Sequence, residues 1–156
     1  MKKKLFIVHL GVGKVGKTFI RQFLSQKKYL ESKYGVEILY QAVLRSTGGL
    51  ADPRGLSEAE LTSFIDRDEE GRDISVKKIL STASSQTILI DTTSSHETYV
   101  FLQEVLEKGG YVVSSNKKPL SMDLKIFYSL MKHRSRIFFE TTVGAGLPVI
   151  STIQDL

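Results

Sequence analysis

The chain has 156 residues, of which 41% are hydrophobic and 25% charged, and these values are ordinary for one globular domain. No apolar stretch reaches the length of a membrane span, and the absence of cysteine excludes disulfides, thiolate catalysis and cysteine metal sites. The net charge of +5 comes from basic residues scattered among acidic ones, without a basic stripe interleaved with aromatic residues. We therefore expect no nucleic-acid or membrane partner and a cytoplasmic location.

The hydrophobic pattern predicts strands and helices that alternate along the chain. In the first half of the chain we expect a strand at 5–10, a helix from 15 to about 28, a strand at 36–44, a loop at 45–55 and a short helix after Ser57, which has Glu60 in cap-box spacing. A polar break at 69–72 and a short helix at 74–80 follow. In the second half we expect strands at 87–91, 111–113 and 136–140, and helices at 97–108, 121–133 and 147–156. Short buried strands alternating with helices imply an α/β fold of the Rossmann-like, doubly wound type, with a mainly parallel sheet covered on both faces.

A glycine-rich run follows the first predicted strand directly. It reads Gly11-Val12-Gly13-Lys14-Val15-Gly16, and a helical pattern starts at once. Strand, G-x-G-x-x-G and helix is the order of a dinucleotide site. Gly11 permits a tight turn, Gly13 lets a pyrophosphate approach the backbone, and Gly16 lets the helix pack against its strand. The helix N-terminus then offers free N–H groups to the phosphates.

The same run also fits a second motif. From Gly11 to Thr18 the sequence reads G-x-x-x-x-G-K-T, which matches the phosphate loop of nucleotide hydrolases, and Asp91 ends an apolar strand where such enzymes bind magnesium. Lys14 stands where these loops usually carry a small residue. The glycine run alone therefore leaves two classes of phosphate site open.

Polar or glycine-rich residues follow every predicted strand, and in an open α/β sheet ligands bind beyond the carboxyl ends of the strands. The segments concerned are 11–16, 45–47, 91–95, 114–119 and 140–148. One crevice can draw on all of them, so the sequence predicts a ligand site at this edge of the sheet.

Three segments together resemble the nucleotide-binding half of homoserine dehydrogenases. They are 11–16, the run Asn116-Lys117-Lys118-Pro119-Leu120-Ser121, and 140–148, in this order and spacing. The resemblance implies interconversion of L-homoserine and L-aspartate 4-semialdehyde with a nicotinamide cofactor, a step of threonine and methionine biosynthesis. It favours the dinucleotide over the hydrolase, because the later motifs have no role in a phosphate-loop enzyme. Lys17 and Thr18 are then ordinary residues of the first helix.

Arg45 at the end of the second strand bears on the choice of cofactor. An NAD site usually has an acidic residue there, whereas this strand ends without an acid until Asp52, and a guanidinium can clamp the 2′-phosphate of NADP. We therefore expect NADP to be preferred over NAD. The alternative is a solvated loop arginine. By the resemblance, the dinucleotide would also contact Ser46, Thr93, Ser94 and Ser115, although Ser94 can equally be a helix cap.

Lys117 is the candidate catalytic residue. Hydride transfer to an aldehyde leaves an alkoxide that must receive a proton, and a lysine beside the site can supply it. The resembled family places the first lysine of Asn-Lys-Lys near cofactor and substrate, which also makes Lys117 a cofactor contact. The alternative is a solvated basic turn before Pro119. His9, His96 and His133 are predicted to have no chemical role.

The segment at 140–148 suggests a cation site. In the resembled family a monovalent cation, usually sodium, is held by a glutamate and main-chain carbonyls, and the matching positions are Glu140, Val143, Ala145 and Leu147. Hard cations prefer such oxygen ligands. The alternative is a glycine-rich hinge in which Glu140 caps the last helix.

The resemblance also predicts the domain organisation. Residues 1–140 would form the NAD(P)-binding Rossmann domain, and 141–156 the hinge and first helix of a catalytic and dimerisation domain that is otherwise absent. The complete protein is then expected to be a homodimer through that domain. The chain by itself is expected to bind dinucleotide with little turnover. A dinucleotide-binding module without catalysis remains the alternative function.

Overall fold

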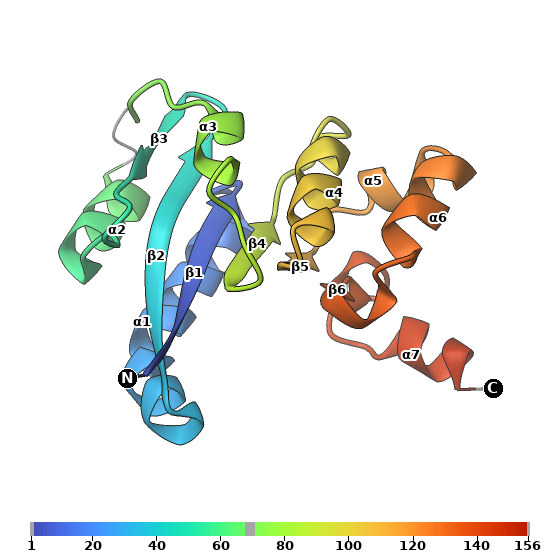
Figure 1. Cartoon of the computed structure of the whole chain (residues 1–156), viewed down its shortest axis with the longest axis horizontal. Coiled ribbons are helices and arrows are strands. Elements are labelled where there is room, and N and C mark those ends of the chain that lie inside the picture. Colours follow the sequence, from blue (N-terminus) through green and yellow to red (C-terminus); the bar gives the residue numbers. More distant parts are fainter. Residues whose placement is uncertain (1, 68–70, 156) are drawn as a thin grey trace.

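The computed structural model describes residues 2–67 and 71–155. Its centre is a six-stranded sheet in the order β3-β2-β1-β4-β5-β6, in which β3 is antiparallel to β2 and every other neighbouring pair is parallel (Figure 1). The strands are β1 (Lys3–Leu10), β2 (Val36–Arg45), β3 (Gly48–Ala51), β4 (Thr87–Asp91), β5 (Tyr111–Ser114) and β6 (Ile137–Phe138). The expected α/β architecture with a mainly parallel sheet is confirmed.

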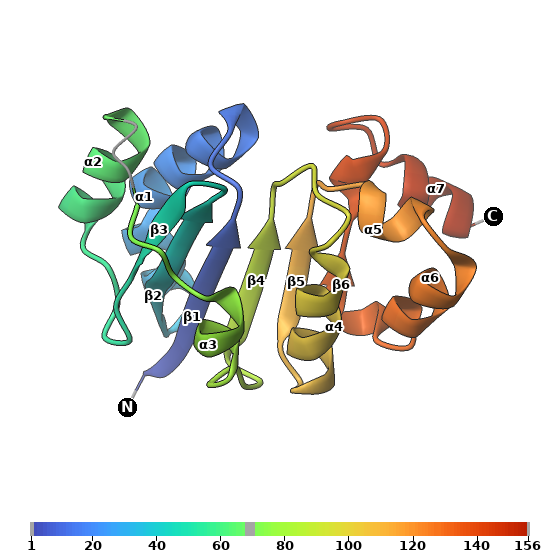
Figure 2. The same cartoon turned by 90° about the horizontal axis from the view of Figure 1, so that it is seen from above.

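Helices cover both faces of the sheet, as Figure 2 shows for α1 and α2 on one side and α3 and α4 on the other. The helices are α1 (Lys14–Tyr34), α2 (Glu58–Asp66), α3 (Val76–Leu80), α4 (Tyr99–Glu107), α5 (Lys118–Ser121), α6 (Leu124–Met131) and α7 (Val149–Gln154), with 3₁₀ turns η1 (Arg134–Arg136) and η2 (Glu140–Thr142). Because successive strand residues point to opposite faces, Ile7 belongs to the hydrophobic cluster that includes residues of α1 and α2, whereas Val8 belongs to the cluster that includes residues of α3, α4 and α6. None of the described helices is long and apolar enough to cross a membrane.

Local signals in the sequence explain several of these boundaries. Ser57 and Glu60 form the expected capping box at the start of α2, with each side chain bonded to the other residue's amide. Gly109 adopts φ of +84° just after α4, which suits a residue without Cβ. β4 occupies the predicted residues, and α1 runs six residues beyond its predicted end.

The predicted loop at 45–55 is wrong for Arg45 and for residues 48–51, which are in strands. β2 continues to Arg45, and after a two-residue turn β3 pairs with it from Gly48 onward. A Cβ on Gly49 would lie 2.5 Å from the Val43 carbonyl oxygen, so the glycine permits this close pairing. The sequence of this segment predicts a loop because glycine does not favour a strand by itself.

Other predicted boundaries also change. The helix expected at 121–133 is α6, which starts at Leu124 because the Asp123 side chain accepts from the Lys125 amide and caps the helix, and the short α5 ends at Ser121 before it. The strand expected at 136–140 shortens to β6 and is followed by η2. Residues 69 and 70 of the polar break at 69–72 lie outside the described ranges.

Candidate functional site

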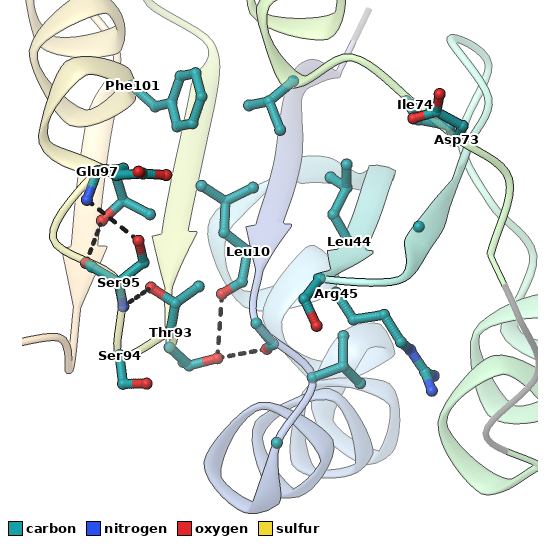
Figure 3. A pocket seen from close by; sticks show the side chains of 18 residues that line it. Leu10, Leu44, Arg45, Asp73, Ile74, Thr93, Ser94, Ser95, Glu97 and Phe101 are labelled. Carbon is teal, nitrogen blue, oxygen red and sulfur yellow. Dashed lines mark hydrogen bonds between the residues drawn. The ribbon is translucent and has the colours of Figure 1, made fainter.

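A cavity of about 660 Å³ lies beyond the carboxyl ends of β1, β2 and β4, where the sequence predicted a crevice. Figure 3 shows Thr93, Ser94 and Ser95 on one side, Leu44 and Arg45 on the other, and Leu10 between them. The predicted site residues that line it are Gly11, Val12, Gly13, Arg45, Ser46, Thr93 and Ser94. Asp73, Ile74 and Phe101, which the sequence did not single out, line it too.

The three glycines of the first loop are in different environments. Gly11 has φ of +92°, and a Cβ there would lie 2.7 Å from the Thr92 carbonyl carbon and the Thr93 nitrogen. A Cβ on Gly16 would lie 2.2 Å from the Gly11 carbonyl oxygen. Around a Cβ on Gly13, no heavy atom of the described residues comes within 4 Å. Two glycines thus serve close packing, and Gly13 leaves open space at the crevice.

The N-terminus of α1 opens onto this space. Gly13 is its N-cap residue, so no side chain bonds to the first amides, and the first turn contains no acidic residue. Unsatisfied N–H groups and the positive end of the helix dipole attract anions. The start of α1 is therefore suited to a phosphate group that enters the cavity beside Gly13.

The geometry argues against the hydrolase reading of the same run. The helix begins at Lys14, and the Lys17 amide already donates to the Gly13 carbonyl, so the loop is too short to wrap around a phosphate. The Asp91 carboxylate, the candidate magnesium ligand, is fully buried and accepts hydrogen bonds from neighbouring side chains and one main-chain amide.

These bonds around Asp91 form a buried network that sequence reasoning missed. One carboxylate oxygen accepts from the amide and hydroxyl of Thr93 at 2.9 and 2.7 Å, and the other from Thr98 at 2.7 Å and the Asn116 amide nitrogen at 3.0 Å. The same nitrogen donates to the Ser95 carbonyl at 2.6 Å. The network ties the loop after β4 to the loop after β5, and so fixes one wall of the cavity.

Arg45 is held in place at the opposite wall. Its Nη2 donates to the Phe64 carbonyl at 2.5 Å, and its guanidinium lies 4.0 Å from the centre of the Phe64 ring in α2. The residue is half-buried, so it is not the solvated loop arginine of the alternative reading. Ser46 follows it in the tight turn to β3.

The remaining predicted cofactor contacts do not line the cavity. They are Lys14, Val15, Gly16, Ser115 and Lys117. Lys117 is exposed at the start of α5, on the same edge of the sheet as the cavity, and Ser115 is held through its amide to the Asp91 carbonyl at 3.0 Å. The catalytic role of Lys117 stays a prediction.

Glu140 makes the contacts of a helix cap. Its carboxylate accepts from the Ile150 amide at 2.7 Å and from the Ser151 amide at 3.2 and 3.3 Å, at the start of α7. The Leu147 carbonyl accepts from the Val149 amide at 2.8 Å. Ala145 has φ of +52°, which is unusual for a residue with Cβ. Among the described residues, no group of three or more His, Asp or Glu side chains could hold a metal ion.

His9 is fully buried in β1, below the glycine loop. Its Nδ1 lies 2.9 Å from the Tyr40 hydroxyl, and its Nε2 lies 3.0 Å from the Thr92 hydroxyl. Burial lowers the pKa of His9 to about 3 and raises the pKa of Tyr40 above its ordinary value. Both side chains are therefore neutral near pH 7. The signal in the sequence that could have identified this buried histidine is a polar residue at a core position of a predicted strand.

Relatives of known identity match almost the whole chain. A bifunctional aspartokinase/homoserine dehydrogenase of Haemophilus influenzae is 31% identical over 99% of the chain. A homoserine dehydrogenase of Emericella nidulans is 42% identical over 81 residues, 49% of the chain. The chain spans 20% and 22% of these two proteins. No protein-family model matches it.

Solved structures agree with these relatives. A hyperthermophilic archaeal homoserine dehydrogenase mutant in complex with NADPH superposes with a TM-score of 0.72 and 25% identity, over 96% of this chain and 48% of that one. A homoserine dehydrogenase from Thermoplasma acidophilum shares the fold, with a TM-score of 0.75. The chain is therefore a homologue of homoserine dehydrogenases and corresponds, along almost its whole length, to their nucleotide-binding part.

Proposed function

We propose that this chain is the dinucleotide-binding part of an enzyme that interconverts L-homoserine and L-aspartate 4-semialdehyde, as in threonine and methionine biosynthesis. The observation that carries the proposal is the start of α1, where Gly13 leaves open space and no side chain caps the first amides. This helix end lies at a cavity whose two walls are fixed by buried contacts. Both relatives named above are homoserine dehydrogenases, and this supports the proposed reaction.

The cavity lining suggests how NADP would be held, with NAD as the weaker ligand. The first amides of α1 would bind the diphosphate, and Arg45 with Ser46 the 2′-phosphate. Thr93 and Ser94 would contact the nicotinamide half, with Ser115 and Lys117 beyond them. When bound, the dinucleotide accepts or donates the hydride. An archaeal relative in complex with NADPH supports this choice of cofactor.

Lys117 would handle the proton of the reaction. In reduction of the semialdehyde, its ammonium donates a proton to the oxygen that becomes the hydroxyl of homoserine, and in oxidation its amine takes that proton back. The placement of Lys117 on the cavity's edge of the sheet supports this role. In the complete protein, Lys117→Ala should nearly abolish turnover while NADP still binds. Retained turnover would exclude Lys117 as the catalytic residue.

We also propose a sodium site at Glu140, Val143, Ala145 and Leu147. One carboxylate and three main-chain carbonyls form a donor set that suits a hard monovalent cation. Glu140 would share its carboxylate between the ion and the first amides of α7. Sodium chloride should then raise the melting temperature more than choline chloride does, and Glu140→Gln should remove the difference. Equal effects of the two salts on the unaltered chain would contradict the site.

A homodimer formed through a further domain, the division of the chain at residue 140, and a cytoplasmic location remain predictions. Val113 and Phe138 support a covering partner for the sheet, because they pair in register and are 36% and 52% exposed on the face opposite α4. Sedimentation of the complete protein would test the dimer, and a monomer at micromolar concentration would contradict it.

Calorimetric titration of the chain with NADP⁺, NAD⁺ and ATP would test the proposed function. We expect NADP⁺ to bind most tightly, and ATP not to bind in a magnesium-dependent manner. Arg45→Ala should weaken NADP⁺ binding roughly tenfold or more, because a charged hydrogen-bond pair is lost, and NAD⁺ binding far less. Arg54→Ala is the matched control, since Arg54 pairs with Asp52 outside this cavity. Absence of dinucleotide binding would overturn the proposal.

Binding and catalysis are separated by a second measurement. Homoserine oxidation by the isolated chain should be negligible, whereas the longest natural form of the protein should turn over. Dinucleotide binding without turnover in that longest form would favour a non-catalytic binding module.

A further inference from the structure

The carbonyl of Gly11 is held from several sides at the base of the glycine loop. The Thr92 hydroxyl lies 2.6 Å from this oxygen and 3.3 Å from the Leu10 carbonyl oxygen. The Gly11 amide, in the preceding peptide group, donates to the Leu44 carbonyl at 2.8 Å, and the Gly11 carbonyl oxygen lies so close to Gly16 that a Cβ on Gly16 would come within 2.2 Å of it. These contacts hold the two peptide groups on either side of the Gly11 Cα, from which the loop continues.

The hydrogen bonds around Thr92 define the proton positions on His9. A threonine hydroxyl has one hydrogen, and both main-chain oxygens near it can only accept. That hydrogen therefore goes to the Gly11 carbonyl, and the Thr92 oxygen must accept from the Nε2–H of His9 at 3.0 Å. Nδ1 then carries no hydrogen and accepts from the Tyr40 hydroxyl at 2.9 Å. One neutral tautomer satisfies every group.

We propose that His9 is a positioning residue for the dinucleotide: through Thr92 it fixes the Gly11 peptide, so that the loop and the first amides of α1 face the cavity. The inference rests on the proposed function, because it takes the dinucleotide as the ligand of that loop. His9 does not touch the ligand. Its bond to Thr92 joins β1 to the loop after β4. The glycine loop and the loop after β4, which would both contact the dinucleotide, are thereby held in a fixed position relative to each other.

The other contacts of the imidazole explain why it is rigid. The Phe19 ring of α1 meets it edge-on with centroids 5.6 Å apart, and the Tyr40 ring of β2 lies 6.1 Å away. Tyr40 is the titratable group among these packed neighbours, and burial keeps both it and His9 neutral. A fixed ring with one tautomer holds the Thr92 hydroxyl in a single orientation.

The test compares two variants that differ only at residue 9. Tyr40→Phe removes the hydroxyl that donates to Nδ1 of His9, leaves the bond from Nε2 to Thr92 in place, and should bind NADP⁺ within about twofold of the unaltered chain. His9→Leu combined with Tyr40→Phe leaves no orphaned tyrosine hydroxyl, removes the donor to Thr92, and should weaken NADP⁺ binding about tenfold. Thr92→Val should cost a similar factor in the unaltered chain and little more in the double variant, because the two residues act as one unit.

A purely structural histidine would give a different result. The variants would then lose stability toward urea without a change in NADP⁺ affinity. If His9 and Thr92 instead acted on binding independently of each other, their separate effects on NADP⁺ affinity would multiply in the combined variant. Either outcome would overturn the proposal. Failure of the unaltered chain to bind NADP⁺ would instead overturn the proposed function.

A second measurement needs no variant. Nitrogen NMR of the unaltered, labelled chain distinguishes a protonated from an unprotonated imidazole nitrogen. We expect the proton of His9 on Nε2 at pH 7, with Nδ1 bare. A proton on Nδ1, or a mixture of tautomers, would overturn the proposal even if the variants failed to fold.

Discussion

Alanine at Gly16 and alanine at Gly13 should differ in their effect on stability, although both should weaken NADP⁺ binding. A Cβ on Gly16 would lie 2.2 Å from the Gly11 carbonyl oxygen and 2.8 Å from the Thr92 hydroxyl oxygen. The nearest atom belongs to the main chain, so no side-chain rotation relieves the contact, and the start of α1 must move by about 1 Å. Such overpacking costs about 3 kcal/mol, and the better helix propensity of alanine returns about 1 kcal/mol.

The expected net loss for Gly16→Ala is therefore about 2 kcal/mol. In a chain of this length it corresponds to a fall in melting temperature of roughly 4–8 °C. NADP⁺ binding should weaken as well, because the displaced helix carries the amides that face the cavity. Urea unfolding and calorimetric titration measure the two effects on the same preparation.

Gly13→Ala is the matched control. Gly13 has φ of −77°, which alanine adopts readily, and its Cβ would meet no described atom within 4 Å. The free energy of unfolding should stay within about 0.5 kcal/mol of the unaltered value. NADP⁺ binding should still weaken by more than about tenfold, because the new methyl occupies the approach of the diphosphate. Equal stability losses for both variants, or unchanged binding by Gly13→Ala, would refute the roles assigned to these glycines.

Three further predictions concern the buried network, the histidine and the last helix. Asn116→Ala should lower the free energy of unfolding by about 3 kcal/mol, because a buried carboxylate loses a donor, whereas Ser115→Ala should change it by less than about 0.5 kcal/mol in the same urea titration. The unfolded chain takes up a proton at His9 near pH 6.5 and the folded chain only near pH 3, so stability should fall as the pH drops between these values, by about 5 kcal/mol in total. His96→Gln should retain that fall, and its loss there would contradict the assignment. Glu140→Ala should cost about 1 kcal/mol and speed hydrogen exchange of the first amides of α7, and unchanged exchange would argue against the cap.

The sequence predicts best the features that depend on neighbouring residues. The apolar run of β4, the capping box of Ser57 and Glu60, and the glycine loop each carry their signal within a few positions. β3 could not be predicted, because Gly48 and Gly49 become a strand only through pairing with β2.

The site shows the same division between local and distant contacts. The position of Arg45 at the end of β2 is a local property, but its contact with Phe64 depends on how α2 returns to the sheet. The bonds of His9 to Tyr40 and Thr92 join residues far apart in the sequence. Lys117 shows a further limit of prediction from sequence. Its position just after a strand predicts the edge of the sheet at which it lies, but not the direction in which its side chain points.

The central position of β1 has a consequence for biosynthesis. β1 is synthesised before both of its neighbours, of which one begins at Val36 and the other, β4, begins at Thr87. During translation its second edge thus stays without a partner until the residues of β4 have been synthesised. An open apolar edge of this kind invites pairing with other nascent chains, and parallel pairing over such sequence separations is slow. Production of the protein should therefore be sensitive to growth temperature and to the supply of chaperones.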